Sequence, residues 1–535
     1  MTFRKFLIAA AAAAMIATAM PVASPAQDFP VEFLKMSAMR RQAPVPSANA
    51  IASYAAAAQL APETKRAVEG LLAEARAADA RGDASAAQLA LAHARALLDG
   101  KPWSPAQAFA SSLEVAPKIP LIDVAAPLQL TVSRAYAAQP AAARLRVSAQ
   151  APGKAPVQLS EVPLSLRKSG DTVVTVNLPK TLEGRADLVS EIVVGGQALA
   201  SSSERVDFVS DLAGIENRTE ARLKAVKASD EAVAVVRYPF QVAKLVRAGE
   251  REIEARAFSD RLERSQSVLA ALESGKDPVL RGVGDQDRAY WFAEPGEYVP
   301  YRIYVPTTWD RTQKLPVIVA LHGGGGDENG MFERESSGKF QKLAERYGYI
   351  VVSPLGYRPL GAYGSPIRLP SVYGTDIKEG REVGGPERAK LLALSEQDVL
   401  NVLEKVATEY GADRSRVYLT GHSMGGGGTW YLAHQHPELW NAIAASAGPF
   451  FIDGYDFERL RKMGIMIVQG SGDPPSLNAD RQLARDLLER GFGVNYVETP
   501  SVNHGQTFGN NLPTIFEFFE RQKLRDHPDV PLPLR

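Results

Sequence analysis

Residues 416–425 read RVYLTGHSMG, a short apolar run followed by the pattern G-x-S-x-G, and they decide the fold of the chain. The apolar run predicts a strand, and residues 426–433 behind it predict the opening of a helix. The sharp turn between them needs glycine at Gly421 and Gly425, because a Cβ atom at either position would clash. Ser423 would then stand exposed at the turn, near the partly positive end of a helix. The stretch therefore predicts an activated serine nucleophile, if the surrounding sequence supplies its partners.

A serine nucleophile needs a base that takes its proton. The chain has seven histidines, and in this arrangement the base is expected on a loop after the last strand. His504 meets that condition, because it follows the strand predicted over residues 494–498. His434 and His436 lie in the helix directly behind Ser423 and cannot turn back to it. His504 is therefore the predicted base, and an ordinary surface histidine is the alternative interpretation.

The base in turn needs a carboxylate that fixes its tautomer and stabilises its protonated form. The carboxylate should follow a strand that lies between Ser423 and His504 in the sequence. Asp473 does so, in the loop GSGDPP behind the strand predicted over 465–469. Glu498, at the end of the next strand, is the main rival. The other acidic candidates, in an early loop or in the following helix, are Asp453, Asp456 and Asp480.

Two backbone amides must also point at the oxyanion that forms when a serine attacks a carbonyl group. The residue after the nucleophile, Met424, supplies the first amide. Residues 322–326, HGGGG, follow the strand predicted over 317–321, and we expect Gly324 or one of its glycine neighbours to supply the second. The sequence argues against the alternative, a phosphate-binding loop, because no Gly-Lys-Ser/Thr follows and the acidic residues Asp327 and Glu328 stand there instead.

Residues 286–526 alternate apolar runs with amphipathic stretches such as 395–410. This alternation predicts an α/β domain whose doubly wound, mostly parallel sheet is covered by helices on both faces. Residues of the site then lie at the carboxyl ends of the strands. The predicted strands are 317–321, 349–353, 417–420, 442–446, 465–469 and 494–498.

The sequence before this domain divides into three parts. Residues 27–115 contain two apolar helical patterns broken at residues 81–83, which predict a helical hairpin. Residues 116–210 alternate apolar and polar side chains between Gly- and Pro-rich turns, which predicts a small β-sandwich of immunoglobulin-like type. Residues 211–285 return to a charged helical pattern. The sandwich is interpreted either as a carbohydrate- or partner-binding module or as a spacer.

Composition narrows the classes of partner. The 535 residues include 61 basic and 61 acidic side chains, so no overall field attracts nucleic acid or an anionic membrane. The chain has no cysteine, which excludes disulfides and thiol chemistry. Residues 1–26 have a basic start, an apolar stretch and small-residue cleavage sites, as in a signal peptide. We expect export to the periplasm or the extracellular space without stable membrane insertion. No pattern indicates an oligomeric state.

The C-terminal domain resembles secreted bacterial α/β-hydrolases related to polyhydroxybutyrate depolymerases, to feruloyl and acetyl xylan esterases, and to prolyl oligopeptidase-type catalytic domains. The stretch GHSMGGGGTW is especially similar to the nucleophile segment of this family. The resemblance covers about residues 290–525 and implies the same Ser-His-Asp triad. The segments that carry it are 316–326, 394–400 and 417–432.

These residues together predict a serine hydrolase that cleaves a small-molecule or oligomeric carboxylic ester through an acyl-enzyme and needs no metal or organic cofactor. A prolyl oligopeptidase-type peptidase is the alternative, although the region before residue 290 is too short and too helical for a seven-bladed propeller. A non-catalytic cell-envelope binding protein is a further alternative. Residues 359–386, rich in Gly, Pro and Tyr, are interpreted as a rim over the pocket or as a long surface loop.

Overall fold

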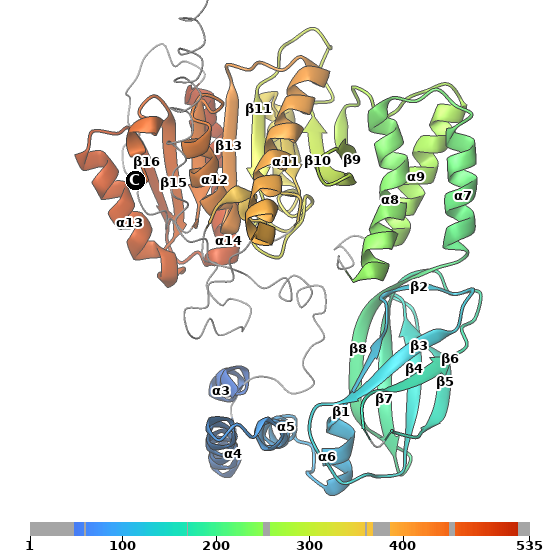
Figure 1. The fold of residues 1–535 in the computed structure, drawn as a ribbon. Helices are drawn as coiled ribbons and strands as arrows, with labels where there is room; N and C mark the ends of the chain where they lie inside the picture. The colour runs from blue at the N-terminus through green and yellow to red at the C-terminus, as the bar shows by residue number, and fades with distance from the viewer. Residues whose placement is uncertain are drawn as a thin grey trace, which may run out of the picture. The chain divides into compact units, whose positions relative to one another are not determined.

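The computed structural model describes residues 48–57, 60–167, 169–249, 257–358, 361–366, 386–448 and 455–522. The signal peptide predicted over 1–26 and most of the segment 359–386 lie outside the described residues. The described chain divides into two compact units that meet in sequence between Pro278 and Val279 (Figure 1). Within the described residues, no helix is long and apolar enough to cross a membrane.

The C-terminal unit is built on an eight-stranded sheet with the order β16-β15-β14-β13-β11-β12-β10-β9. The strands from β11 to β16 are parallel to one another, whereas β10 runs antiparallel to both β12 and β9. The predicted doubly wound, mostly parallel α/β fold is therefore confirmed, with β9 and β10 as an additional antiparallel edge. The strands are β9 (Gly284–Phe292), β10 (Glu297–Val305), β11 (Val317–Leu321), β12 (Ile350–Pro354), β13 (Val417–His422), β14 (Ala442–Ser446), β15 (Gly464–Gly470) and β16 (Val494–Thr499).

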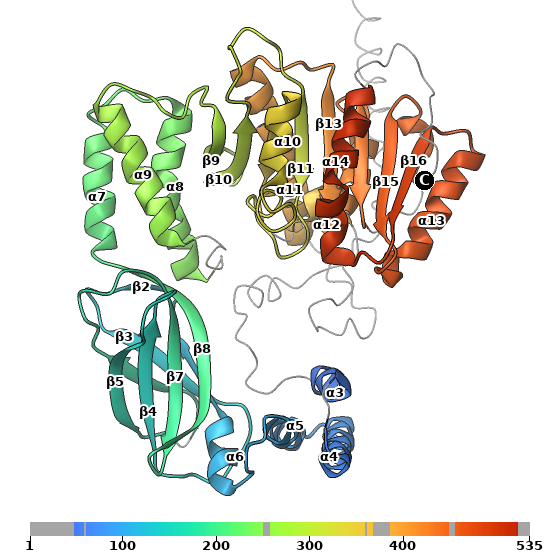
Figure 2. The ribbon, with the colours of Figure 1, turned by 180° about the vertical axis from the view of Figure 1, so that it is seen from behind.

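Helices cover both faces of this sheet (Figures 1 and 2). Helices α10 (Lys339–Tyr347) and α14 (His504–Gln522) pack on one face, where Phe340 and Phe516 join an apolar cluster. The opposite face carries α11 (Pro386–Tyr410), α12 (Met424–Gln435) and α13 (Pro474–Glu489). Successive residues of one strand point to opposite faces, so both faces of the central strands are apolar. The carboxyl ends of the parallel strands are consequently held in place by two separate cores.

The N-terminal unit begins with helices. Helices α4 and α5 form the expected hairpin, and the side chain of Asp83 between them accepts a hydrogen bond from the Ala86 amide at 3.0 Å, which caps α5. A third helix joins this hairpin through Ile51, which lies in the same apolar cluster as Val68 and Leu72. The helices of this part are α3 (Ala48–Ala57), α4 (Pro62–Ala80), α5 (Ala84–Leu98) and α6 (Pro105–Ser111).

Two sheets that share one core follow these helices, as the predicted β-sandwich requires. The sheets have the orders β1-β3-β6 and β2-β8-β7-β4-β5. Buried Leu130 of β3 and Leu145 of β4 belong to the same core cluster. The strands are β1 (Leu113–Pro117), β2 (Leu121–Asp123), β3 (Leu128–Arg134), β4 (Ala143–Gln150), β5 (Val157–Leu164), β6 (Thr172–Val176), β7 (Gly184–Val194) and β8 (Gln197–Val209). Helices α7 (Leu212–Leu223), α8 (Asp230–Ala248) and α9 (Phe258–Glu273) complete the unit.

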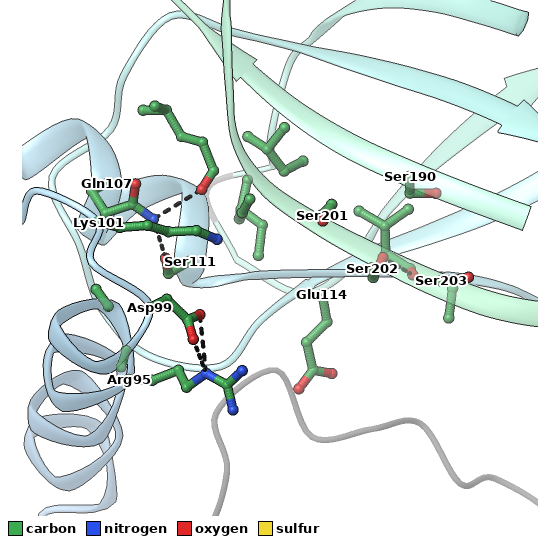
Figure 3. Close-up of a pocket in the computed structure, with 18 of the residues that line it drawn as sticks. Arg95, Asp99, Lys101, Gln107, Ser111, Glu114, Ser190, Ser201, Ser202 and Ser203 are labelled. Atoms are coloured by element: carbon green, nitrogen blue, oxygen red, sulfur yellow. Dashed lines mark hydrogen bonds and ion pairs between the residues drawn. The ribbon is translucent and has the colours of Figure 1, made fainter. Parts of the chain in front are cut away.

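A cavity of about 280 Å³ lies in the N-terminal unit between α5, α6 and the strands β1, β7 and β8 (Figure 3). Its wall is mixed: consecutive serines of β8 and the side chains of Gln107 and Ser111 stand beside alanine, leucine, valine and isoleucine side chains. The amide of Gln107 donates to the Ser111 hydroxyl at 2.8 Å and to the Leu199 carbonyl at 2.9 Å. These bonds tie α6 to the end of β8, so the cavity is part of the contact between the helices and the sandwich.

Candidate active site

Ser423 stands at a strained turn between β13 and α12. Its backbone has φ 56° and ψ −117°, a region that residues other than glycine seldom adopt. A Cβ atom on Gly421 would overlap the Gly425 carbonyl, and one on Gly425 would overlap the Leu321 carbonyl. The Ser423 amide donates to the Ser446 carbonyl of β14 at 2.9 Å, which holds the turn against the sheet. The local backbone therefore has the form that the sequence pattern predicts for an exposed nucleophile.

One predicted amide donor lies in this turn and the other in a neighbouring loop. Met424 is the first residue of α12, where an amide has no acceptor within its own helix. The loop behind β11 packs beside the serine, since a Cβ atom on Gly323 would lie 3.5 Å from the Ser423 Cβ. Gly324 follows in the same loop and is partly buried. The positions of Met424 and this loop are compatible with an oxyanion hole, with Gly323 packed directly beside the serine.

Buried contacts fix the start of the glycine loop. The ring nitrogens of His322 lie 2.9 Å from the Gly323 carbonyl oxygen and 3.0 Å from the Leu355 carbonyl oxygen. The Tyr363 hydroxyl donates to the His322 carbonyl at 3.1 Å. Tyr363 is 1% exposed, so this tyrosine of the proposed rim supports the loop from below and does not line a surface. Its role was not predicted, because a Gly- and Pro-rich sequence gives no sign of burial.

The structure brings Ser423, His504 and Asp473 together in one hydrogen-bonded line. His504 Nε2 lies 2.8 Å from Ser423 Oγ, and His504 Nδ1 lies 2.7 Å from Asp473 Oδ2. His504 is the first residue of α14, and Asp473 directly precedes α13, where its side chain makes no capping hydrogen bond to the helix. Both follow parallel strands that end at the same edge of the sheet as β13. The geometry allows Asp473 to orient the imidazole while the other ring nitrogen faces the serine hydroxyl.

The surroundings of His504 favour its protonated form. The hydrogen bond that His504 Nδ1 donates to the Asp473 carboxylate raises the pKa of His504 above its usual value, and burial opposes this rise. A base of this kind accepts a proton readily from a serine hydroxyl and is inactivated when acid protonates it. Hydrolysis that depends on neutral His504 would consequently fall as the pH drops through this raised pKa.

The rival carboxylates have other partners or positions. Glu498 accepts two hydrogen bonds from Arg481, at 2.8 and 2.6 Å, and one from Tyr496 at 2.8 Å. Asp480 is buried, and burial raises its pKa to about 7. Asp456 accepts a hydrogen bond from the backbone at the start of a short helix, and Asp453 lies outside the described residues. Of the candidates in the described chain, Asp473 alone has a hydrogen bond to His504 in the structure.

Sequence reasoning missed two side chains beside this line. His422 precedes the nucleophile, and its ring centre lies 4.9 Å from that of His504. Glu335 is 7% exposed and lies beside Gly323, because a Cβ atom on that glycine would be 3.5 Å from Glu335 Oε1. His422 occupies a variable position of the G-x-S-x-G pattern, and Glu335 belongs to no motif, so no sequence signal assigns either residue to the site. In the described part of the chain, no cluster of His, Asp and Glu has the arrangement of a metal site.

Part of the C-terminal domain is similar in sequence to known esterases. Residues 293–454 match the model of a family described as "Putative esterase". The match includes Ser423 and the glycine loop and ends before Asp473 and His504.

Two fungal enzymes are similar over part of the chain. Feruloyl esterase B of Talaromyces stipitatus is 31% identical over 160 residues, which are 29% of this chain and 37% of that protein. Acetylxylan esterase A of Aspergillus ficuum is 30% identical over 155 residues, 28% of this chain and 44% of that protein. The chain thus spans less than half the length of either relative. The expected relationship of the C-terminal domain to α/β-hydrolase esterases is confirmed, and a bacterial source and secretion remain predictions.

Among solved structures, a thermostable esterase is 17% identical with a TM-score of 0.34, covering 77% of this chain and 97% of its own. The feruloyl esterase module from Clostridium thermocellum, solved with sinapinate, is 16% identical with a TM-score of 0.33, covering 44% of this chain and 86% of its own.

Proposed function

We propose that the C-terminal domain hydrolyses carboxylic esters by acyl transfer through Ser423. The observation that carries this proposal is the continuous line of hydrogen-bonded atoms from Ser423 through His504 to Asp473, with separations of 2.8 and 2.7 Å. Both distances are those of strong hydrogen bonds between side chains. The strained turn that presents the serine and the glycine loop beside it support the same reaction.

The reaction follows from these contacts in two halves. His504 takes the proton of the Ser423 hydroxyl while the oxygen attacks the ester carbonyl, and the resulting oxyanion accepts hydrogen bonds from the amides of Met424 and Gly324. His504 then gives its proton to the departing alcohol, which leaves an acyl group on the serine. Water repeats the sequence, and the carboxylic acid departs as the free serine returns. Asp473 stabilises the imidazolium in both halves.

We propose an acetyl or feruloyl group as the acyl part of the substrate. The similarity of the nucleophile region to enzymes named feruloyl esterase and acetylxylan esterase supports this choice. The peptidase alternative has no support from the family match or from these relatives. Export to the periplasm or the extracellular space remains a proposal that rests on residues 1–26.

The test compares the full chain with a Ser423→Ala variant on p-nitrophenyl acetate, methyl ferulate and an aminoacyl p-nitroanilide. The proposal expects hydrolysis of at least one ester, weak or absent hydrolysis of the anilide, and a loss of about a thousandfold or more in the variant. Unchanged ester hydrolysis in Ser423→Ala, or a clear preference for the anilide, would contradict it.

A further inference from the structure

A buried carboxylate, that of Glu335, lies beside His422, whose ring packs against that of His504. Glu335 Oε2 is 3.7 Å from His422 Nε2, and the His422 ring lies against that of His504 with centres 4.9 Å apart. The side chains of Glu335 and His422 are only 5% and 3% exposed. Acyl transfer through Ser423, His504 and Asp473 makes no use of either group. A buried charge is costly unless it is paired, so the partners of Glu335 need to be identified.

The position of Glu335 is tied to the helix that begins with the base. Its amide donates to the Gly330 carbonyl at 2.9 Å. Its carbonyl packs against Gly509 of α14, where a Cβ atom would overlap it. Arg334 donates to Oε1 at 2.9 Å, so the carboxylate is paired on the side of the glycine loop. The other oxygen, Oε2, is the one directed at His422.

His422 is neutral at neutral pH, because burial lowers its pKa to about 4. Its Nδ1 lies 3.4 Å from the Ser446 hydroxyl, and its Nε2 faces Glu335. A neutral ring in this place adds no positive charge beside His504. It separates the carboxylate from the base without competing for the proton that the base takes from the serine.

We propose that Glu335 is a positioning residue that stabilises protonated His504 across the His422 ring. This inference rests on the proposed function, since a protonated His504 is the species formed when Ser423 attacks. The attack of Ser423 creates a positive imidazolium and a negative oxyanion. Negative Glu335 lies on the side of the imidazolium. Its positive partner, Arg334, lies on the side of the glycine loop, with Nη1 3.5 Å from the Gly325 carbonyl oxygen.

The field at His504 comes from few groups in the described residues. Asp473 contacts Nδ1 and acts most strongly, and Glu335 acts in the same direction from behind the ring. His422 packs against the ring, and the Ser423 hydroxyl faces Nε2. Removing the Glu335 charge therefore lowers the pKa of His504 while its hydrogen bond to Asp473 remains.

The test measures the titration of His504 itself in the full chain. With seven histidines in the sequence, selectively ¹³C-labelled histidine gives a small set of NMR signals, and a His504→Gln variant identifies the one of interest. In Glu335→Gln we expect the pKa of His504 to fall by on the order of half a pH unit. The acid limb of the kcat/KM profile should move by the same amount, and kcat should fall about threefold, the factor to which half a pKa unit corresponds. Glu335→Asp keeps the charge, so its His504 pKa should lie between those of the wild type and Glu335→Gln.

Glu458→Gln is the control, because it removes an exposed carboxylate that pairs with Arg461 shortly before the start of β15, away from the carboxyl ends of the strands. It should leave the His504 titration unchanged. A merely structural role of Glu335 would lower thermal stability without moving this titration. An unchanged titration in a folded Glu335→Gln variant would overturn the proposal, and so would a shift in Glu335→Asp as large as that in Glu335→Gln. The NMR measurement needs no substrate, so it remains decisive even if no ester is hydrolysed.

Discussion

Replacing Asp473 by asparagine tests the roles of the three side chains more finely than removing the serine does. The carboxylate is 7% exposed and lies 2.7 Å from His504 Nδ1. Asparagine keeps the shape but removes the charge that stabilises the imidazolium and selects the tautomer. For such a contact we expect kcat to fall by about 1,000- to 10,000-fold, which corresponds to about 4 to 5.5 kcal/mol in activation free energy. The rate is measured with p-nitrophenyl acetate between pH 5 and 9.

The pH profile gives a second readout of the same substitution. Asp473 is the main cause of the raised pKa of His504, so the acid limb should move to lower pH in Asp473→Asn. Glu498→Gln is the matched control: it disrupts the contact with Arg481 and should keep activity within about threefold, the range of a surface ion pair. If Asp473→Asn stayed within tenfold of the wild type while Glu498→Gln lost activity, Glu498 would be the acid and our assignment would be wrong.

Two predictions concern the framework of the site. Gly425→Ala places a methyl group against the Leu321 carbonyl, so the C-terminal domain should lose about 3 kcal/mol or more of stability; an unchanged melting temperature in calorimetry would refute this. Arg288 is fully buried and donates to Glu409 at 2.8 Å. Arg288→Met removes the cationic partner of that carboxylate and leaves it the Arg281 backbone amide at 2.6 Å, and we expect urea unfolding to report a loss of about 3–5 kcal/mol. A loss below 1 kcal/mol would mean that Glu409 finds another partner.

Much of the parallel sheet could be predicted from the sequence because its strands are buried on both faces. The runs 317–321 and 442–446 coincide with β11 and β14, since a strand covered on both sides is apolar throughout. Strands β9 and β10 were not predicted. They carry Arg288 and Arg302, which read as surface residues in the sequence but are buried against acidic partners. Those partners are distant in sequence, so no local pattern announces them.

Some residues of the site could be placed from the sequence, and others could not. Ser423, Asp473 and His504 each follow a parallel strand, and parallel strands end at one edge, so their order in the chain predicts their proximity. Glu335 reaches the site by a different route. It lies in an irregular segment that packs on α14 through Gly509, and tertiary packing of that kind leaves no periodic trace in the sequence.

The central claim is that the side-chain oxygen of Ser423 accepts the acyl group. The most direct measurement is to react the full chain with a fluorophosphonate probe and to map the modified residue by peptide mass spectrometry. Our account predicts one adduct per chain, on Ser423, and no adduct in Ser423→Ala at the same probe concentration. An adduct on another residue, or undiminished labelling of Ser423→Ala, would contradict it.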